Sequence, residues 1–350
     1  LYDAVPTSAH AEHHARKLAD MSSVEAIGRA ARRIAEESLE PIKSASDFAS
    51  EAQQTIWNAS RELHGRSLKG VDSIMFDAIN HLDKEDFQSI PTGFSGLDRL
   101  LGGFRPGNLV IVAARPGIGK TALMICFSAF AAIHKYPGLF VSIEMDISDL
   151  ADRFLSVHAR LDLLSIQRRN LPVDKKARVI DAAQQFAGTP LTFDDSPSPS
   201  VMDIAAKARA VATQNGGLSL LFVDYLQLVR SPSRDTREQE VGIVSRGLKA
   251  IAKDLRCCVI AASQLSRKID SREGGRPLLS DLRESGSIEQ DADSVLFIHR
   301  PNAMKSEASA LEKGSTELIL AKNRHGPTGV IPARFHESFV RFDQVTDASV

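Results

Sequence analysis

Cysteine is scarce in this sequence, and the few cysteines are poorly placed for a disulfide framework or a metal site. Three of the 350 residues are cysteines, namely Cys126, Cys257 and Cys258. All three lie in apolar runs, and two of them are adjacent, so they lack the paired spacing of zinc ligands. This excludes a small extracellular domain held together by disulfides and favours a reducing, cytoplasmic location.

Long apolar runs and a surplus of one charge are also missing. No apolar run approaches the roughly 20 residues that a helix needs to span a bilayer, and the opening residues LYDAVPTSAH lack the apolar core of a signal peptide. We therefore expect a soluble protein with no membrane partner. The formal net charge is -1, so a polyanion would have to be held by a local basic surface. The first residue is Leu1 and not methionine, which favours a fragment or a trimmed product.

Aromatic residues are few as well. They make up 6% of the chain and lie mostly within apolar runs, so platforms for stacking nucleic-acid bases are not evident. Any binding to nucleic acid should then be largely electrostatic and should weaken with salt. The 43% of hydrophobic and 25% of charged residues are an ordinary globular balance, which excludes a disordered or fibrous chain.

The first quarter of the chain has the pattern of amphipathic helices. Apolar residues recur at helical spacing over residues 7 to about 39 and again over 46–63, which predicts a helical hairpin within a partial N-terminal domain, residues 1–65. Residues 66–88 are expected to be a linker that contains a short amphipathic helix, 71–82. A cluster of histidines in the first helix is interpreted as surface, with metal binding as the alternative: His10, His13 and His14.

From residue 89 to residue 350 short apolar runs alternate with helical patterns. This alternation predicts an α/β domain with a central, mostly parallel sheet flanked by helices. The expected strands are 109–114, 138–143, 218–224, 257–263, 294–299 and 316–321. The turn HGPTG and the runs VIPARF and VRFDQV follow the last of them, so the end of the domain should be antiparallel.

The stretch AARPGIGKTALM, residues 113–124, predicts a phosphate-binding loop between a strand and a helix. Gly117 and Gly119 permit close approach of a phosphate chain, Lys120 supplies positive charge, and the hydroxyl of Thr121 suits Mg²⁺. Ala114 stands where the usual pattern has glycine, and an alanine there is tolerated if its φ is negative.

Three further polar residues end apolar strands. Asp224 is expected to hold Mg²⁺ through water, with a capping role as the alternative. Glu144 is the acid best placed to orient an attacking water, although its charge would also suit the start of the next helix. Gln264 is a candidate sensor of the γ-phosphate, or simply a polar residue at the end of a strand.

Together these residues resemble the replicative helicases of the DnaB type, within the RecA-like ATPases. The resemblance spans residues 88 to 343 through the blocks IPTGFSGLDRLLGGFRPG, FVSIEM, FVDYLQL, REQEVGIVSRGLKAIAKDL, ASQLSR, DLRESGSIEQDAD and AKNRHGPTG. It implies a RecA-like P-loop core and makes Ala114 a family feature. The nucleotide-binding residues it implies are Arg115, Pro116, Gly117, Ile118, Gly119, Lys120, Thr121, Ala122 and Asp224.

The resemblance also implies residues that act on a neighbouring subunit and on DNA. Lys322 and Arg324 would reach the neighbour's γ-phosphate as a sensor lysine and an arginine finger, with an exposed basic hairpin edge as the alternative. A channel loop would bind successive DNA phosphates through Arg283, Glu284 and Gly286. A second basic loop contains Arg230, Arg234 and Arg237, whose simpler interpretation is solvated charge and whose alternative is DNA contact.

The implied function is a ring-forming, ATP-dependent and Mg²⁺-dependent DNA helicase. It would be a homo-hexamer that moves 5′ to 3′ on single-stranded DNA at a fork, with a helicase loader and a primase as further partners. The earlier half of the family's N-terminal domain has no counterpart in the sequence. The alternatives are another RecA-like ATPase, such as a recombinase, and a DNA-binding ring without unwinding activity in which ATP controls assembly.

Overall fold

A computed structural model describes most of the chain. The described residues are 8–39, 89–231, 236–265, 275–303 and 307–345, together with Phe48, Ala52, Thr55, Ile56, Ala59, Val71, Met75, Ile79, Ile269 and Lys305. Side chains are described from Met21 onward, apart from Ser23 and residues 283–287. The chain divides into two compact units, residues 1–87 and 88–350.

The first unit is helical where it is described. Helix α1 spans Ser8–Glu37. Ala26 and Ala30 on α1 are buried, and Nη2 of Arg33 donates to Oγ1 of Thr55 at 2.8 Å. Further helical residues are Phe48, Ala52, Thr55, Ile56 and Ala59, and then Val71, Met75 and Ile79. The helical hairpin and the linker helix stay predictions because the residues between these points lie outside the described part, as do the side chains of the three histidines on α1.

The second unit is built on a nine-stranded sheet with the order β3-β2-β4-β5-β1-β6-β7-β8-β9. The strands are β1 Leu109–Ala114, β2 Gly138–Ser142, β3 Leu191–Asp194, β4 Leu220–Asp224, β5 Cys258–Gln264, β6 Ser294–His299, β7 Ser315–Asn323, β8 Gly329–His336 and β9 Arg341–Gln344. Strands β1 to β6 pair in parallel, and β6 to β9 pair antiparallel. The predicted mostly parallel sheet and its antiparallel end are thus confirmed.

Strand β3 was not predicted from the sequence. It has four residues at the edge of the sheet, and none of them is fully buried. Such a short segment does not carry the sustained apolar run by which the inner strands were predicted. The remaining strand predictions hold to within two residues at each end.

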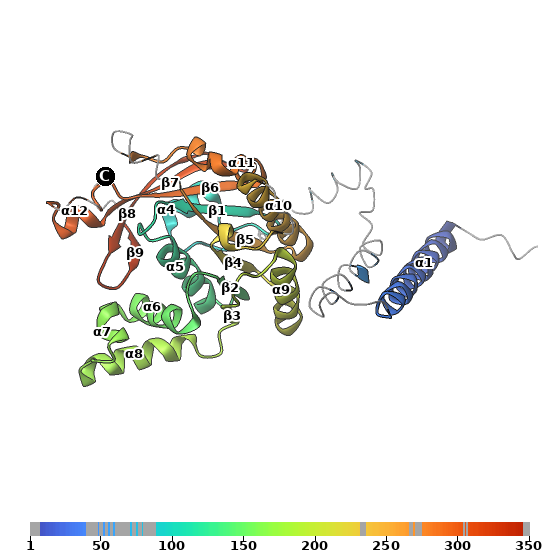
Figure 1. Cartoon of the computed structure of the whole chain (residues 1–350), viewed down its shortest axis with the longest axis horizontal. Coiled ribbons are helices and arrows are strands. Elements are labelled where there is room, and N and C mark those ends of the chain that lie inside the picture. The colour runs from blue at the N-terminus through green and yellow to red at the C-terminus, as the bar shows by residue number, and fades with distance from the viewer. Residues whose placement is uncertain are drawn as a thin grey trace, which may run out of the picture. The chain divides into compact units, whose positions relative to one another are not determined.

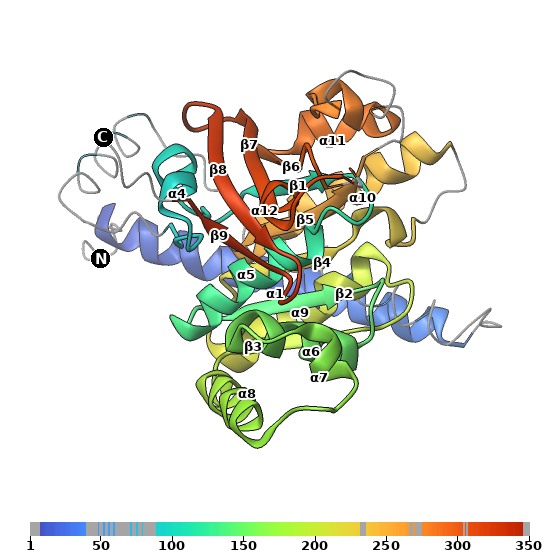
Figure 2. The same ribbon diagram turned by 90° about the vertical axis from the view of Figure 1, so that its left-hand side faces the viewer.

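Helices cover both faces of the sheet (Figures 1 and 2). One face packs against α4 Ser95–Leu101, α5 Lys120–Ile133 and α6 Ile147–Ala159. The other face packs against α9 Val201–Asn215, α10 Arg237–Leu255 and α11 Gly286–Asp291. Side chains alternate along β1, so that Val110 and Val112 enter the first core while Leu109 and Ile111 enter the second.

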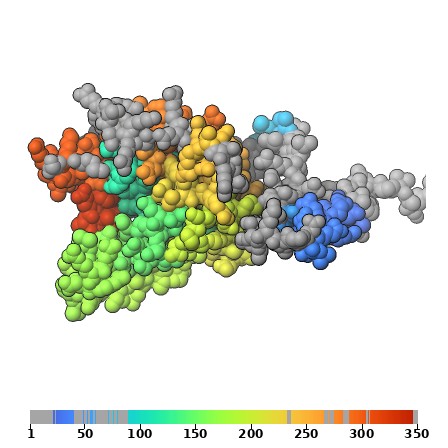
Figure 3. Space-filling model, in the orientation of Figure 1, coloured from blue at the N-terminus to red at the C-terminus, as the bar shows by residue number. Residues whose placement is uncertain are grey.

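A helical lobe extends from the edge of the sheet, seen in green in Figure 3. It consists of α6, α7 Leu163–Gln167 and α8 Val173–Phe186, with a small core of its own around Ile166 and Ala182. A short helix, α12 Ala310–Gly314, precedes β7. All three cysteines are free thiols. Within the described ranges, no helix combines the length and apolarity required to cross a membrane.

Candidate nucleotide-binding active site

The predicted phosphate loop connects the end of β1 to the start of α5. Ala114 is the last residue of β1, pairs with Gln264 of β5 and does not have a positive φ, so the backbone there does not require glycine. Gly117 and Gly119 have φ values of 74° and 112°, which favour glycine. A Cβ atom at Gly119 would also lie 3.0 Å from Cζ of Phe342. The loop therefore depends on glycine at residue 119 for both its backbone conformation and its packing.

Thr121 and Asp224 meet beneath this loop. Oγ1 of Thr121 donates to Oδ2 of Asp224 at 2.6 Å, while Oδ1 of Asp224 is buried and has no hydrogen-bond partner. Asp224 is 1% exposed, and this burial raises the pKa of its carboxyl group, although Thr121 and Lys120 partly oppose the shift. A buried carboxylate oxygen without a partner, next to a hydroxyl, fits the oxygen ligands that Mg²⁺ prefers.

Asp224 does not act as a helix cap, which was its alternative role. The turn that follows, η1 Leu226–Leu228, has Tyr225 at its N-cap and no side-chain capping bond. Lys120 lies nearby, with Nζ 5.7 Å from the centre of the Tyr225 ring. Burial lowers the pKa of Lys120, and the charges of Asp224 and Glu144 oppose that shift. An anion in the site would favour the charged form of this lysine in the same way.

These groups open into a pocket of about 440 Å³. Eight of the residues that line this pocket were predicted from the sequence as site residues: Pro116, Gly117, Gly119, Lys120, Thr121, Ala122, Glu144 and Gln264. Glu144 is exposed and follows β2, in a turn where Oγ of Ser142 donates to the Met145 carbonyl at 2.7 Å. The cap of α6 is Asp146, whose side chain accepts from the N–H of Asp149. Glu144 precedes this cap by two residues, so its charge also lies near the start of α6, and both interpretations of Glu144 stay predictions.

Gln264 ends β5 at the rim of the same pocket. Its N–H donates to Oε1 of Gln227 at 3.3 Å, and Nε2 of Gln227 donates to Oγ of Ser263 at 2.9 Å. The strand end is thus fixed through its backbone, while the Gln264 side chain is exposed. Two other predicted residues of the loop do not line the pocket: Ile118 is buried, and Arg115 is half-buried.

Two pocket arginines were missed by the sequence analysis. Arg153 on α6 has a buried Nε without a hydrogen-bond partner, and its charge helps to lower the pKa of Asp224. Arg300 follows β6 directly and is 7% exposed. A search for polar residues after every apolar strand, as applied to Asp224, would have found Arg300. Arg153 lies within an amphipathic helix and carries no such signal.

Arg300 joins the phosphate loop to the β8–β9 hairpin. Its Nη2 donates to Lys313 O at 2.9 Å and to Oε1 of Glu337 at 2.7 Å, and Nη1 lies 3.5 Å from Ile118 O. The guanidinium also lies 4.3 Å from the centre of the Phe335 ring. Phe335, Glu337 and Val340 complete the pocket wall, so the hairpin supplies an apolar and acidic side opposite the cationic loop.

Lys322 and Arg324 are not in this pocket. They lie where β7 ends, beside the start of β6, since Lys322 pairs with Val295 and Ser294 pairs with Val110. That is the opposite end of β1 from the phosphate loop. Lys322 is half-buried, which lowers its pKa together with the charge of Arg324. Arg324 has a side chain that is 48% exposed.

The predicted DNA residues are only partly described. Arg283 and Glu284 lie in the turn η4 Leu279–Ser285, and Gly286 begins α11, while their side chains lie outside the described part. Arg234 also lies outside it. Arg230 is exposed, and Arg237 pairs with Glu240 at 2.9 Å and contacts the Gln227 carbonyl. Arg237 therefore has partners within its own chain.

Comparison with known proteins identifies the family of the chain. A family model described as the DnaB-like helicase C terminal domain matches residues 89–344. The chain belongs to the DnaB-like helicase family. It is thus a replicative DNA helicase, an enzyme of the ATP-hydrolysing class.

Individual relatives cover both units of the chain. Replicative DNA helicase DnaB of Geobacillus stearothermophilus is 35% identical over 350 residues, which is 98% of this chain and 76% of that protein. A solved structure of an isolated ATPase domain superposes with a TM-score of 0.74 at 30% identity, covering 79% of this chain and 99% of that domain. A solved structure of a DnaB-like replicative helicase, described with its interactions with primase, superposes with a TM-score of 0.77 at 27% identity. The match covers 98% of this chain and 81% of that chain. The predicted RecA-like ATPase core is confirmed by these structures.

Proposed function

We propose that this chain is one subunit of a ring that hydrolyses ATP between neighbouring subunits and thereby moves along single-stranded DNA to unwind a fork. The observation that carries this proposal is the separation of the predicted catalytic residues. The phosphate loop, Glu144 and Asp224 lie at one end of the sheet, and Lys322 and Arg324 lie at the other. One ATP site is complete only when two chains meet.

The phosphate end of the pocket suits ATP with Mg²⁺. Lys120 and the loop N–H groups bind the β- and γ-phosphates. Thr121 would hold Mg²⁺ through its hydroxyl, and Asp224 through its buried Oδ1, which has no protein partner. When bound, Mg²⁺ neutralises charge on these two phosphates. Arg153 adds a cation near the same carboxylate.

The opposite wall of the pocket suits the nucleoside. Phe335 and Val340 offer apolar surface for a base, and Glu337 offers a carboxylate that can accept from a hydroxyl or an amine. Arg300 holds Glu337 and the phosphate loop together, so the two halves of the nucleotide would be bound by parts of the fold that are linked by hydrogen bonds.

Glu144 is proposed to orient the attacking water. The water oxygen forms a bond to the γ-phosphorus while the bond to the bridging oxygen breaks, and the electron pair leaves with ADP. The water keeps one hydrogen on the phosphate product and loses its other proton to solvent. Glu144 accepts a hydrogen bond from that water, and Lys120 stabilises the charge that develops. Gln264, which lines the rim of the pocket, is proposed to report whether the γ-phosphate is present.

Arg324 and Lys322 are proposed to complete the site of the next subunit. Strand β1 has six residues, and a strand rises about 3.3 Å per residue, so its first and last residues lie roughly 17 Å apart. A single side chain does not cover that distance, and the 48% exposure of Arg324 leaves it accessible to a neighbour. An arginine supplied in this way is worth ~10³- to 10⁵-fold in rate.

DNA and protein partners complete the proposal. Residues 283–286 would bind successive phosphates of one strand in the centre of a six-membered ring, with movement 5′ to 3′ and Arg230 as a secondary contact. The first unit would face a loader and a primase, the latter because one structural relative is described with primase. We place the protein in the cytoplasm, because its three thiols are free and its relatives are replication proteins of bacteria.

The proposal is tested by unwinding of a forked DNA with Mg²⁺ and ATP, using Lys120→Ala as the control. We expect unwinding by the wild type and none by the variant. Mixing Arg324→Ala with Lys120→Ala should restore hydrolysis, because some interfaces then combine an intact loop with an intact arginine. DNA-stimulated hydrolysis without unwinding would contradict the helicase proposal, and full hydrolysis by Arg324→Ala alone would contradict the shared site.

A further inference from the structure

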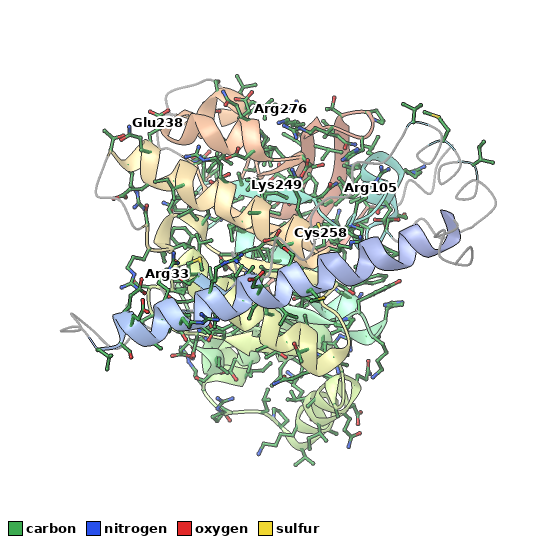
Figure 4. All side chains as sticks on the ribbon, turned by 90° about the vertical axis from the view of Figure 1, so that its right-hand side faces the viewer. Arg33, Arg105, Glu238, Lys249, Cys258 and Arg276 are labelled. Carbon is green, nitrogen blue, oxygen red and sulfur yellow. The ribbon has the colours of Figure 1, made fainter. Side chains whose placement is uncertain are left out.

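A buried ionic cluster, which the sequence did not indicate, lies where β6 begins. Its centre is Asp293, which is 3% exposed. Oδ2 of Asp293 accepts from the N–H of Leu109 at 2.7 Å and pairs with the ammonium group of Lys249 on α10, which is labelled in Figure 4. Oδ1 lies 3.5 Å from Nη1 of Arg324. The carboxylate therefore has a fixed position, with the half-buried Lys249 on one oxygen and the exposed Arg324 on the other.

The end of α11 holds the same two basic residues. Nη2 of Arg324 donates to the Gln290 carbonyl at 2.7 Å. Nζ of Lys322 donates to the Ala292 carbonyl at 2.8 Å and also to the carbonyl of Glu289. Carbonyl groups at the end of a helix lack partners within the helix and carry partial negative charge, so they favour cations. Helix α11 thus binds both side chains through its backbone.

We infer that Asp293 positions Arg324 for the ATP of the neighbouring subunit, and that α11 links this position to DNA bound at residues 283–286. The inference rests on the proposed function, because it takes Arg324 as the arginine that acts on the neighbour. Asp293 itself touches no nucleotide, and it acts through Arg324.

The connection to DNA follows from chain continuity. The turn η4 ends at Ser285, and α11 begins at Gly286 and ends at Asp291, one residue before Ala292. A shift of residues 283–286 on binding DNA therefore moves the carbonyls of residues 289, 290 and 292, which hold Lys322 and Arg324. Asp293 is anchored independently by Lys249 and Leu109, so it provides a fixed point against which Arg324 moves.

Arg324 keeps donors available for a phosphate in this arrangement. A guanidinium has five N–H donors, and the two side-chain contacts to Asp293 and Gln290 use only some of them. Anchoring restricts a long, flexible side chain before the neighbour arrives. A misplacement of about 1 Å in such a group can cost ~10²-fold in rate, so loss of the anchor should be visible in turnover.

The test measures ATP hydrolysis by the full chain with and without oligodeoxythymidine. We expect Asp293→Asn to lower kcat by about 10- to 100-fold and to abolish stimulation by DNA, with the KM for ATP within about threefold of the wild type. The KM should hold because the phosphate loop is intact. Asp293→Glu provides a second variant, which keeps the charge but moves it by one methylene group. We expect it to fold and to show a smaller decrease in kcat and in stimulation by DNA than Asp293→Asn.

Two comparisons separate positioning from a structural role. The double variant Asp293→Asn/Arg324→Ala should hydrolyse ATP no more slowly than Arg324→Ala alone, because the two residues act as one unit. Lys249→Gln removes the other cation that faces Asp293 and should lower the melting temperature. It should leave kcat and DNA stimulation within about threefold of the wild type, because the N–H of Leu109 still holds Oδ2 of Asp293.

The possible results are distinct. Wild-type kcat and DNA stimulation in Asp293→Asn, together with an inactive Arg324→Ala, overturn this inference and leave the proposed arginine finger intact. The inference is also overturned if the losses of kcat in the two single variants multiply in the double variant. It is likewise overturned if Lys249→Gln loses as much kcat as Asp293→Asn, because Asp293 would then have only a structural role. Full activity of Arg324→Ala contradicts the shared ATP site itself, and the inference fails with it.

Discussion

The two ends of the central strands each contain a buried aspartate next to a lysine, but the two carboxylates differ in their hydrogen bonding. Asp224, at the carboxyl end, is 1% exposed and has one oxygen without a partner. Asp293, at the amino end, is 3% exposed and has a donor on each oxygen. Both carboxylates are buried, but only Asp224 has an oxygen without a hydrogen-bond partner, which fits the ligand-binding role proposed for Asp224 and a role in holding protein groups for Asp293.

This difference gives opposite expectations for the same substitution. We expect Asp224→Asn to lower ATP hydrolysis by at least ~10²-fold, because it removes the carboxylate that is proposed to hold Mg²⁺ at the phosphates. Without nucleotide its melting temperature should equal or exceed that of the wild type, since the raised pKa of Asp224 means that the fold favours a neutral group there. Asp293→Asn should instead lower the free energy of unfolding by about 2 kcal/mol, because it removes charge-assisted bonds that are already made.

Thermal unfolding and steady-state hydrolysis of the two variants, measured side by side, check this pair. Asparagine is the matched change at both sites, because it keeps the shape and one oxygen acceptor. A large loss of stability in Asp224→Asn, or none in Asp293→Asn, would break the contrast between the two ends.

The second prediction concerns the two glycines of the phosphate loop. Gly119→Ala places a Cβ atom 3.0 Å from Phe342 at a φ of 112°, whereas Gly117→Ala meets no atom within 4 Å at a φ of 74°. We expect Gly119→Ala to weaken ATP binding by roughly tenfold or more, since strain of about 1 to 3 kcal/mol is combined with a clash. Gly117→Ala introduces only the backbone strain, so we expect a smaller loss of affinity for ATP.

A fluorescent ATP analogue gives the dissociation constant of each glycine variant. Equal losses would show that packing against Phe342 is not what restricts residue 119. The substitution Phe342→Leu, which makes room beside residue 119, should recover part of the binding lost by Gly119→Ala and none of that lost by Gly117→Ala.

The sequence predicted the carboxyl end better than the amino end for a physical reason. The phosphate loop is one continuous segment, and Asp224, Glu144 and Gln264 each end or follow an apolar strand, where parallel strands bring polar residues to one edge. The partners of Asp293 are dispersed, since Lys249 is 44 residues away and Leu109 is 184 residues away. No local pattern marks Lys249, which reads as a polar residue on an amphipathic helix. Strand β3 and Arg153 were missed for the same lack of a local signal.

Arg300 is a third buried charged residue to compare. It lies at the carboxyl end of β6, like Asp224 at the end of β4, but its guanidinium has hydrogen-bond partners within the protein, as the carboxylate of Asp293 does. We expect Arg300→Met to lower the free energy of unfolding by about 2 to 4 kcal/mol, as it leaves the carbonyls of Ile118 and Lys313 without their donor. Glu337→Gln, which changes a side chain that is 55% exposed, should cost less than about 1 kcal/mol. Denaturant unfolding of both variants checks this, and equal effects would contradict the view that Arg300 supports the loop through its backbone contacts.

The smallest expected effect is a change in the stability of the folded protein with pH. We expect it to come from Asp224 at the carboxyl end of the strands. Burial raises the pKa of Asp224 above its ordinary value of 3.8, so the folded protein retains a proton at pH values where the unfolded chain has lost it. The folded state then binds more protons, and its stability falls as pH rises from about 3.8 through the raised pKa. Lys120 has the opposite effect, because its pKa is lowered by burial and stability then rises with pH between that lowered pKa and the ordinary value of 10.5.

Asp224→Asn lacks the titrating group and should lack this part of the pH dependence. The difference in melting temperature between Asp224→Asn and the wild type, measured without nucleotide, should therefore be smallest near the ordinary carboxyl pKa and should widen toward neutral pH. Addition of ATP with Mg²⁺ should narrow it, because a bound cation stabilises the ionised carboxylate of the wild type only. A difference that stays constant with pH would mean that Asp224 titrates alike in the folded and unfolded chains, and the buried Oδ1 would then not be the desolvated ligand that distinguishes this end of the sheet.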